Sequence, residues 1–360
     1  MPCSISWRTN CVPLNSPAAE TRVNLMGFTG ASDELSAEER LIARYFRPLA
    51  TSTGAFALGD DAATVTPPTG CDLVVTADGV IAGVHFLPDD PPETIGRKVL
   101  RMNLSDLAAK GARPVGFLLS IALPAAIDEA WLAAFAAGLG EDVKHFDCPL
   151  LGGDTDRTPG PLSVSIAAFG AVPHGTMVRR STAKAGDSVV VTGTIGDAAL
   201  GLLLRRAGAL AARWRLADAM SAQLRRRYVQ PEPRNAIAKA VLHHASAAMD
   251  VSDGLVGDLA KLCRASGVAA EVDVARVPLS DAARAAVAAE PAVLETALTG
   301  GDDYEILLTL APEKFSAFRN AARAAGIAAT EIGRVTAGQG ARFLRGGTAM
   351  TFARASYSHF

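Results

Sequence analysis

The sequence predicts an α/β protein of layered α+β architecture with two domains. Short apolar segments of strand length alternate with longer segments of helical spacing, which is typical of layered α/β structures. The 360 residues, 49% of them hydrophobic, are enough for two domains that each bury a core. The alternation stops over residues 172–186, where proline, glycine and basic residues cluster. We therefore place a domain boundary in that segment.

Helices and strands of the first half can be assigned from capping and periodicity. Residues 36–45 predict an amphipathic helix, because Ser36 is a good cap and Glu39 stands three residues later. Residues 72–76 predict a short apolar strand that carries Asp78 at its C-terminal end. The remaining predicted elements are a helix over 95–110, a strand over 115–123, a helix over 129–146 and a buried strand over 149–151 that ends in a glycine turn.

The second half begins with a strand over 188–192, a glycine turn over 193–197 and a helix over 198–206. This order can cradle an anion, because free N–H groups and the helix dipole point outward at a helix N-terminus. The same order is also common where a glycine turn only packs a helix onto a sheet. Residues 247–250 and 254–266 repeat the arrangement. The basic, amphipathic segment 205–227 is interpreted as a solvated helix face.

Composition excludes several classes of partner. The net charge of −2 gives no bulk attraction to nucleic acid or anionic lipid. No apolar run approaches the ~20 residues of a membrane span. Five cysteines are scattered without C-x-x-C spacing, which argues against a disulfide framework or a zinc site, so a cytoplasmic location is expected. Residues 1–33 are expected to form a disordered N-terminal extension, and the first 25 lack the apolar region of a signal peptide.

Four short acidic motifs adjoin glycine residues, which let the backbone turn sharply and approach a ligand. Single Gly-Asp pairs are common in turns, and Asp is a favoured helix N-cap, a role that Asp253 could fill for the helix starting at Gly254. Clustered carboxylates instead raise each other's pKa and are favoured where hard cations neutralise them. Together with residues 76–79 and 103–106, the motifs favour a shared site for Mg²⁺ and phosphates. The four motifs are residues 59–61, 152–156, 250–254 and 300–303.

The order of these motifs resembles that of thiamine-monophosphate kinases. That family belongs to the superfamily of aminoimidazole ribonucleotide synthetases and selenophosphate synthetases. The resemblance runs from about Leu35 to Phe360. It rests on GDDAA (59–63), TADGVIAGVHF (76–86), NLSDLAAKGARP (103–114), LLGGDTDR (150–157), VTGTIGDAALGL (191–202), MDVSDGL (249–255) and TGGDDYEI (299–306).

The resemblance implies an aminoimidazole ribonucleotide synthetase-like fold. Residues 34–174 would form the N-terminal α/β domain, which binds metal and ATP and pairs its sheet with that of a second copy in a homodimer. Residues 175–360 would form the C-terminal α/β domain. The implied activity is ATP-dependent phosphorylation of thiamine monophosphate to thiamine diphosphate, by direct in-line transfer assisted by several Mg²⁺ ions and without a covalent nucleophile.

The resemblance also implies roles for individual residues. Asp78, Asp106 and Asp253 would act in catalysis through the metal. His85 and Asp302 would bind the substrate, with an aromatic ring from Phe352 or Tyr357. The implied ATP-binding residues are Gly153, Asp154, Arg180 and Ser252, and the implied metal ligands are Asp61, Thr76, Asp78, Asp106, Asp154, Asp250 and Asp253.

The sequence departs from the family pattern at three places. Ala77 stands where a hydroxyl residue is common, Asp302 stands where many members have Glu, and the C-terminus has Ser356 and Ser358 in place of the usual Gly and Asp. The alternative functions are another ATP-using member of the superfamily, similar to aminoimidazole ribonucleotide or selenophosphate synthetase, or a metal-dependent phosphatase. Selenide chemistry would need a reactive cysteine in a glycine-rich loop, whereas Cys3 and Cys11 lie in an unpatterned tail.

Overall fold

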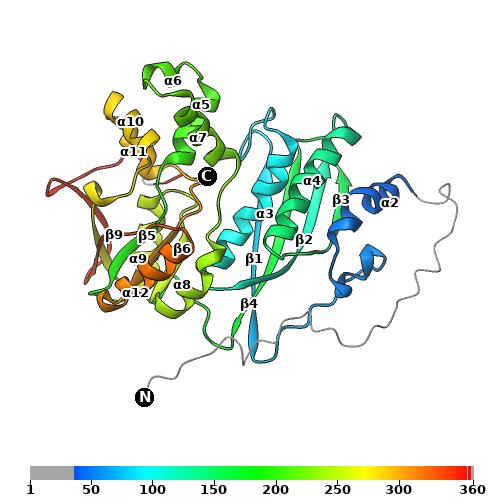
Figure 1. The fold of residues 1–360 in the computed structure, drawn as a ribbon, viewed down its shortest axis with the longest axis horizontal. Coiled ribbons are helices and arrows are strands. Elements are labelled where there is room, and N and C mark those ends of the chain that lie inside the picture. The colour runs from blue at the N-terminus through cyan, green and yellow to red at the C-terminus, as the bar shows by residue number, and fades with distance from the viewer. Residues whose placement is uncertain (1–35, 355, 358–360) are drawn as a thin grey trace.

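The computed structural model describes residues 36–354, 356 and 357 and contains two layered α/β domains side by side (Figure 1). The predicted α/β class is therefore confirmed. The expected N-terminal extension, residues 1–33, lies outside the described residues. The N-terminal sheet has the order β1-β4-β2-β3, in which β2 and β3 are parallel and the other pairs antiparallel. Its strands are β1 (Cys71–Ile81), β2 (Arg113–Leu123), β3 (Leu150–Arg157) and β4 (Ser163–Pro173).

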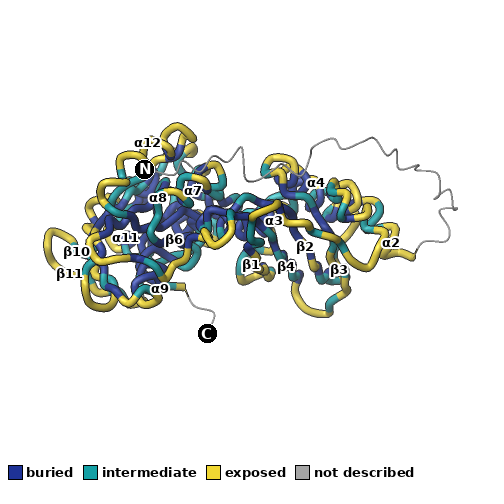
Figure 2. Tube along the Cα trace, turned by 90° about the horizontal axis from the view of Figure 1, so that it is seen from below, coloured by how far each residue is buried: buried dark blue, intermediate teal, exposed yellow. Residues whose placement is uncertain are grey.

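Two long helices, α3 (Pro92–Ala109) and α4 (Glu129–His145), cover one face of this sheet (Figures 1 and 2). Each begins and ends within three residues of its prediction. Ile95 and Val99 of α3 join the core of the N-terminal domain, while Ala108 and Ala109 join a second core with residues of the C-terminal domain. Because α3 is buried by both domains, it fixes the side chains that it carries relative to each of them.

The N-terminal helical segment precedes the sheet. Its predicted capping box is confirmed: the Ser36 hydroxyl accepts a hydrogen bond from the Glu39 N–H at 3.1 Å, and the Glu39 carboxylate accepts from the Ser36 N–H at 2.6 Å. The helix itself is shorter than predicted, because its second half widens into a π-helical turn. The elements are α2 (Ala37–Leu41), the π-helix η1 (Ile42–Phe46) and the 3₁₀ segments η2 (Arg47–Leu49) and η3 (Thr53–Leu58).

Two strand predictions are corrected. Strand β1 does not end before Asp78, since pairing with β4 continues from Cys71 to Ile81 and places Asp78 opposite Ile166. Strand β3 does not stop at a glycine turn but runs through it. Gly153 lies so close to β2 that a Cβ atom would be 1.8 Å from the Leu119 carbonyl oxygen. Only glycine fits there, so packing between strands accounts for this residue.

The C-terminal domain has a mixed seven-stranded sheet of order β11-β10-β7-β9-β5-β8-β6. The predicted strand 188–192 is confirmed as β5, and the predicted strand 247–250 as β6. The strands are β5 (Ser188–Thr192), β6 (Ala247–Asp250), β7 (Ala269–Asp273), β8 (Ile306–Leu310), β9 (Ala329–Thr336), β10 (Gly340–Arg345) and β11 (Thr348–Ala349).

Helices pack against this sheet and form a separate cluster beside it (Figure 1). The interpretation of residues 205–227 as a solvated face is wrong for Trp214 and Arg227, which are 1% and 4% exposed. The helices are α5 (Asp197–Arg206), α6 (Leu210–Arg213), α7 (Asp218–Val229), α8 (Ala238–His244), α9 (Leu255–Ser266), α10 (Asp281–Ala289), α11 (Val293–Thr299) and α12 (Phe315–Ala324), with 3₁₀ turns η4 (Asn235–Ile237), η5 (Val274–Arg276) and η6 (Pro312–Lys314).

Candidate active site

Acidic side chains from both domains meet where α3 contacts the C-terminal domain. Asp78 extends from β1 and Asp106 from α3, while Asp250 ends β6. The Thr76 hydroxyl donates a hydrogen bond to Asp106 Oδ2 at 2.5 Å, and the Ser105 hydroxyl donates to Asp250 Oδ2 at 2.8 Å. Residues predicted from motifs far apart in the chain, such as Asp78 and Asp250, therefore form one cluster across the domain boundary.

The pKa values in this cluster show that the carboxylates repel one another. Burial raises the pKa of Asp78 to about 6, and the neighbouring carboxylates of Asp106 and Asp253 add to the effect. Burial also raises the pKa of Asp250 well above its usual range, with a further contribution from Asp106. Crowded carboxylates of this kind stabilise a bound cation, because the cation relieves their repulsion.

Two basic residues adjoin the acidic cluster. Lys110, at the C-terminal end of α3, donates a hydrogen bond to the Ala248 carbonyl oxygen at 2.8 Å. Burial lowers the pKa of Lys110, against the opposing effect of Asp250 and Asp106, and the nearby Arg180 lowers it further. Sequence reasoning predicted Arg180 as an ATP contact but did not single out Lys110, although it lies inside a recognised motif.

Asn103 is the residue that fixes the backbone beneath Asp78. Its side chain is fully buried, accepts a hydrogen bond from the Asp78 N–H at 3.0 Å and donates one to the Val99 carbonyl oxygen at 2.9 Å. Asn103 and Asp106 lie three residues apart on α3, as predicted, but they serve different purposes. Asn103 ties β1 to α3, and Asp106 presents its carboxylate beside that of Asp78.

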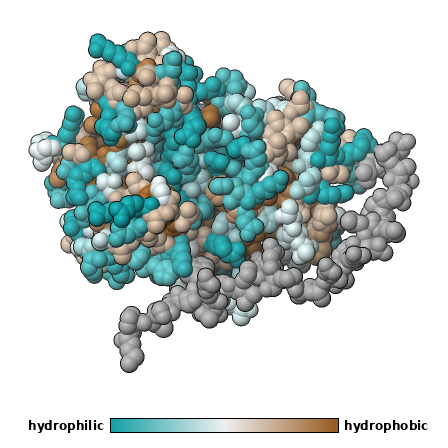
Figure 3. Space-filling model, in the orientation of Figure 1, coloured by the Kyte–Doolittle hydropathy of each residue, from teal (hydrophilic) through white to brown (hydrophobic). Residues whose placement is uncertain are grey.

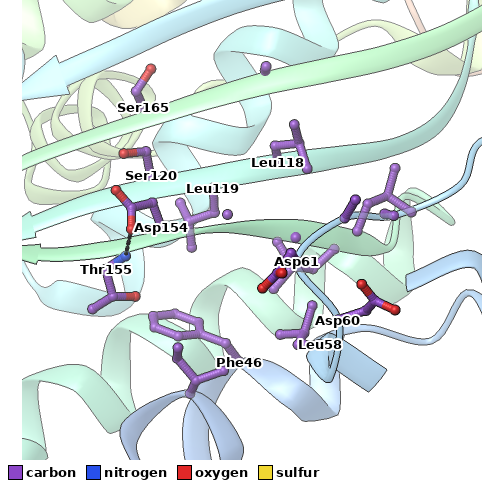
Figure 4. Close-up of a pocket in the computed structure, with 18 of the residues that line it drawn as sticks. Phe46, Leu58, Asp60, Asp61, Leu118, Leu119, Ser120, Asp154, Thr155 and Ser165 are labelled. Atoms are coloured by element: carbon purple, nitrogen blue, oxygen red, sulfur yellow. Dashed lines mark hydrogen bonds between the residues drawn. The ribbon is translucent and has the colours of Figure 1, made fainter. Parts of the chain in front are cut away.

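Asp61 and Asp154 lie in a different place from the cluster. They line a cavity of about 860 Å³ beside β3 together with Asp60, Ser120 and residues of η1 (Figure 4). Asp154 pairs with Ser120 in the sheet register, so it points to the face opposite α3, and its Oδ1 accepts a hydrogen bond from the Thr155 N–H at 3.0 Å. The predicted metal ligands are thus divided between two faces of the N-terminal sheet.

The loops 250–254 and 300–304 pack directly against each other. The N–H groups of Asp302 and Tyr304 donate to the carbonyl oxygens of Ser252 and Val251, each at 2.9 Å. A Cβ atom at Gly301 would lie 2.3 Å from the Ser252 carbonyl oxygen, so this contact needs glycine. Close packing of the two loops therefore accounts for the glycine at position 301.

Asp253 does not cap α9, although its position made that role possible. The cap residue is Gly254, and the Asp253 carboxylate is instead paired with Lys261 of α9. Asp258 accepts the hydrogen bonds from the N–H groups of Ser252 and Asp253, at 3.1 and 2.9 Å. The carboxylate of Asp253 therefore does not cap α9, and its negative charge makes a small contribution to raising the pKa of Asp78.

The predicted substrate residues occupy the same boundary between the domains. Lys98 of α3 contacts both the His85 carbonyl oxygen and Asp302, each at 2.9 Å. Tyr357 is 49% exposed, and its N–H donates to the Asp253 carbonyl oxygen at 3.0 Å. Phe352 instead packs edge-on against Phe343, with ring centroids 5.7 Å apart. Of the two aromatic candidates, Tyr357 is the one placed beside the acidic loop.

The glycine turn before α5 is not open to an external anion. The buried carboxylate of Asp303 accepts hydrogen bonds from the N–H groups of Gly196 at 2.7 Å and Ala198 at 3.4 Å. Burial raises the pKa of Asp303 well above its usual range, opposed by the Gly196 hydrogen bond and the Arg227 charge. Of the two readings that the sequence left open for this turn, packing of the helix onto the sheet is the one that the structure supports.

The donor set of the acidic cluster suits magnesium. Within the described residues, no group of three or more His, Cys, Asp or Glu side chains could by itself hold a metal ion. Mg²⁺ does not require three protein ligands, since it usually takes one or two carboxylates and completes its shell with water and phosphate oxygens. Burial, together with the neighbouring carboxylates, raises the pKa of Asp78, and both fit a cation held in that way.

Two family models match the chain: AIR synthase related protein, N-terminal domain, over residues 59–172, and AIR synthase related protein, C-terminal domain, over residues 184–345. The chain is therefore an AIR synthase-related protein. The same fold extends to the hydrogenase maturation protein HypE of E. coli, which is 18% identical with a TM-score of 0.71.

Closer relatives define the family. The thiamine-monophosphate kinase of Caulobacter vibrioides is 45% identical over 323 residues, covering 88% of this chain and 89% of the relative. The crystal structure of the Stenotrophomonas maltophilia K279a thiamine-monophosphate kinase is 40% identical with a TM-score of 0.76, covering 88% and 98%. AaThiL complexed with AMPPCP and TMP is 30% identical with a TM-score of 0.70, covering 93% and 100%. The chain belongs to the thiamine-monophosphate kinase family and is an enzyme of that phosphotransferase class.

Proposed function

We propose that this enzyme transfers the γ-phosphoryl group of ATP in line to a phosphate oxygen of thiamine monophosphate, giving thiamine diphosphate and ADP. The observation that carries this proposal is the acidic cluster formed by Asp78, Asp106 and Asp250 across the domain boundary, with Lys110 and Arg180 beside it. The AMPPCP and TMP complex of AaThiL supports a site that accepts a nucleotide together with a second phosphorylated compound.

The chain's own residues would work by positioning two polyanions. Asp78, Asp106, Asp250 and Asp253 would hold Mg²⁺, which when bound neutralises phosphate charge as the transfer proceeds. Lys110 and Arg180, which adjoin the carboxylates, would offset the remaining negative charge. Positioning and electrostatic stabilisation account for most of the catalysis in phosphoryl transfer.

The chemistry needs no general base. A phosphate monoester loses its second proton with a pKa of about 6, so the attacking oxygen already carries negative charge near neutral pH. His85 and Asp302 would hold the thiamine part, and Tyr357 would offer an exposed ring beside the Asp253 loop. Free thiamine presents a neutral hydroxyl, which lacks this activation and should be a poor acceptor.

Mass analysis of the products tests the proposal. The enzyme is incubated with ATP, Mg²⁺ and either thiamine monophosphate or thiamine, and parallel samples contain excess EDTA. We expect thiamine diphosphate and ADP in equal amounts, only with the monophosphate and only with free Mg²⁺. Release of inorganic phosphate without thiamine diphosphate would identify a phosphatase, and equal use of free thiamine would contradict the proposed acceptor.

We further propose that the open face of the N-terminal sheet pairs with that of a second copy. Val75 and Leu118 on this face are 60% and 37% exposed. On the side that α3 and α4 cover, hydrophilic residues are intermixed with apolar ones (Figure 3). A homodimer would bury the apolar side chains and would bring Asp154 to the interface.

Sedimentation equilibrium tests the dimer. The wild type is expected to be a dimer, and the double variant Val75→Glu/Leu118→Glu a monomer, because charges would be buried at the interface. Met177→Glu is the control, since Met177 is 39% exposed outside this sheet. A monomeric wild type would contradict the proposal.

Two observations bear on location. Within the described residues, no helix is long and apolar enough to cross a membrane. Cys148 and Cys263 are buried free thiols. We propose a cytoplasmic location, with which the free thiols are consistent.

A further inference from the structure

Lys98 is a charged side chain buried between the two domains. It is 2% exposed and projects from α3 toward the C-terminal domain. Its Nζ donates hydrogen bonds to the His85 carbonyl oxygen and to Asp302 Oδ2, each at 2.9 Å, and lies 4.0 Å from the centre of the Tyr228 ring. A carbonyl oxygen, a carboxylate and an aromatic face together compensate the ammonium group for its lost water.

The partners of Lys98 belong to different domains. His85 lies in the N-terminal loop 82–91, between β1 and α3, whereas Asp302 and Tyr228 belong to the C-terminal domain. Arg205 of α5 holds the far end of the same loop, because its Nη2 donates to Asp90 Oδ1 at 2.7 Å. The loop that carries His85 is therefore fastened to the C-terminal domain at two points.

Further hydrogen bonds orient the side chains of His85 and Asp302. Asp302 has a positive φ of 71°, and its second oxygen, Oδ1, accepts a hydrogen bond from the buried Tyr304 hydroxyl at 3.2 Å. The Nδ1 atom of His85 accepts from the Ile81 N–H at 3.0 Å, which fixes the ring relative to the end of β1. Lys98 supplies the contact that relates these two separately fixed groups to each other.

We propose that Lys98 is a positioning residue for the phosphate acceptor, holding the His85 loop and Asp302 at a set separation across the domain boundary. This inference rests on the proposed function. Lys98 is too buried to reach solvent, so it acts through His85 and Asp302 and not by touching ATP. Its loss should therefore weaken use of the acceptor more than use of ATP.

Steady-state kinetics of Lys98→Met, which keeps a similar unbranched apolar chain but removes the ammonium group, test the proposal. We expect the KM for thiamine monophosphate to rise by at least ~10-fold while the KM for ATP changes by less than ~2-fold. Lys98→Arg, which keeps a cation, should recover part of the loss. If Lys98→Met does not fold, Lys98→Gln replaces it, since the amide can still donate to the His85 carbonyl oxygen.

Arg101→Met is the matched control. Arg101 lies one turn further along α3, and it also connects the domains, because its Nη1 donates to the Pro231 carbonyl oxygen at 2.9 Å and its Nε pairs with Asp142 at 2.6 Å. Removing it costs an interdomain contact without touching His85 or Asp302. We expect lower stability and an unchanged KM for the acceptor.

A double-mutant cycle with Asp302→Asn separates positioning from general damage. If Lys98 acts through Asp302, the acceptor KM of the double variant Lys98→Met/Asp302→Asn should exceed that of the wild type by a factor smaller than the product of the two single-variant factors. Multiplicative effects, equal changes in both KM values, or the same KM change in Arg101→Met would each overturn the proposal. A wild type that makes no thiamine diphosphate would instead refute the proposed function, which the product assay detects independently.

Discussion

Two groups of buried charge in this protein differ in how they are balanced. In the C-terminal domain, Glu305 is fully buried and is paired with Arg227 at 3.0 Å and with Arg234, while the Thr192 hydroxyl donates to it at 2.8 Å. At the domain boundary, Asp78 has carboxylates as its principal charged neighbours, and its pKa is raised to about 6 by burial and by Asp106.

This difference in charge pairing distinguishes acidic residues that maintain the fold from acidic residues that are available to bind a cation. A buried carboxylate with its own arginines has no remaining capacity for an external cation, so Glu305 joins strands and helices of its domain. Neighbouring carboxylates repel one another, and this repulsion destabilises the folded protein unless a cation is bound. In the motif at 299–306, Asp303 and Glu305 are structural, whereas Asp302 lies at the domain boundary, where it pairs with Lys98 at 2.9 Å.

The largest expected effect is on stability, at the balanced group. Glu305→Ala would leave Arg227 and Arg234 without their shared partner and should lower the free energy of unfolding by about 3–5 kcal/mol. Urea denaturation measures this change. Glu271→Ala is the control, because Glu271 pairs with Arg342 at the surface at 3.3 Å, and its loss should cost no more than about 1 kcal/mol. Equal costs for both variants would remove the distinction between the two groups.

At the crowded group the expected effect is on catalysis. Asp106→Asn should reduce kcat by ~10²-fold or more, the scale of one lost electrostatic contact in a site that excludes water. Circular dichroism and thermal melting should show a folded protein. Asp218→Asn, an exposed acidic residue in the first turn of α7, serves as the control and should keep full activity. Full turnover by Asp106→Asn at limiting Mg²⁺ would show that Asp106 is not a ligand of the metal.

The smallest expected effect is a change of folding stability with pH that is caused by Asp78. The folded protein holds a proton on Asp78 with a pKa of about 6, above the ordinary value of 3.8. The stability that comes from holding this proton is fully present below the ordinary pKa of an aspartate. It is lost as the pH rises through the pKa of Asp78 in the folded protein. Without metal, Asp78→Asn should therefore be more stable than the wild type at pH 8, on the order of 1 kcal/mol, and equal to it near pH 4.

Urea denaturation in EDTA at the two pH values measures the Asp78 effect. Added Mg²⁺ at the higher pH should stabilise the wild type more than Asp78→Asn, because the amide no longer contributes charge to the cation. A variant that is less stable than the wild type at both pH values would show that the carboxylate is not repelled by its neighbours.

Local patterns in the sequence predicted several of the helices and strands. Period, capping and turn chemistry identified α3, α4, β2, β5 and β6 within a few residues, because these signals act between near neighbours. The capping box at Ser36 is one example. Strand ends were less well predicted: β1 and β3 continue past their apolar segments because partner strands extend them, and no local signal encodes a partner.

The sequence by itself determined the family, the two-domain α/β class and the identity of the acidic motifs. Only the tertiary structure decided what each acidic residue meets. Glu305 is paired across 113 positions with Thr192, and Asp302 across 204 positions with Lys98, while Asp154 points to the opposite face of the sheet from Asp78. The physical reason is that charge compensation depends on distance in space. Carboxylates that look alike in the sequence therefore differ once folding gives some of them an arginine and others only another carboxylate.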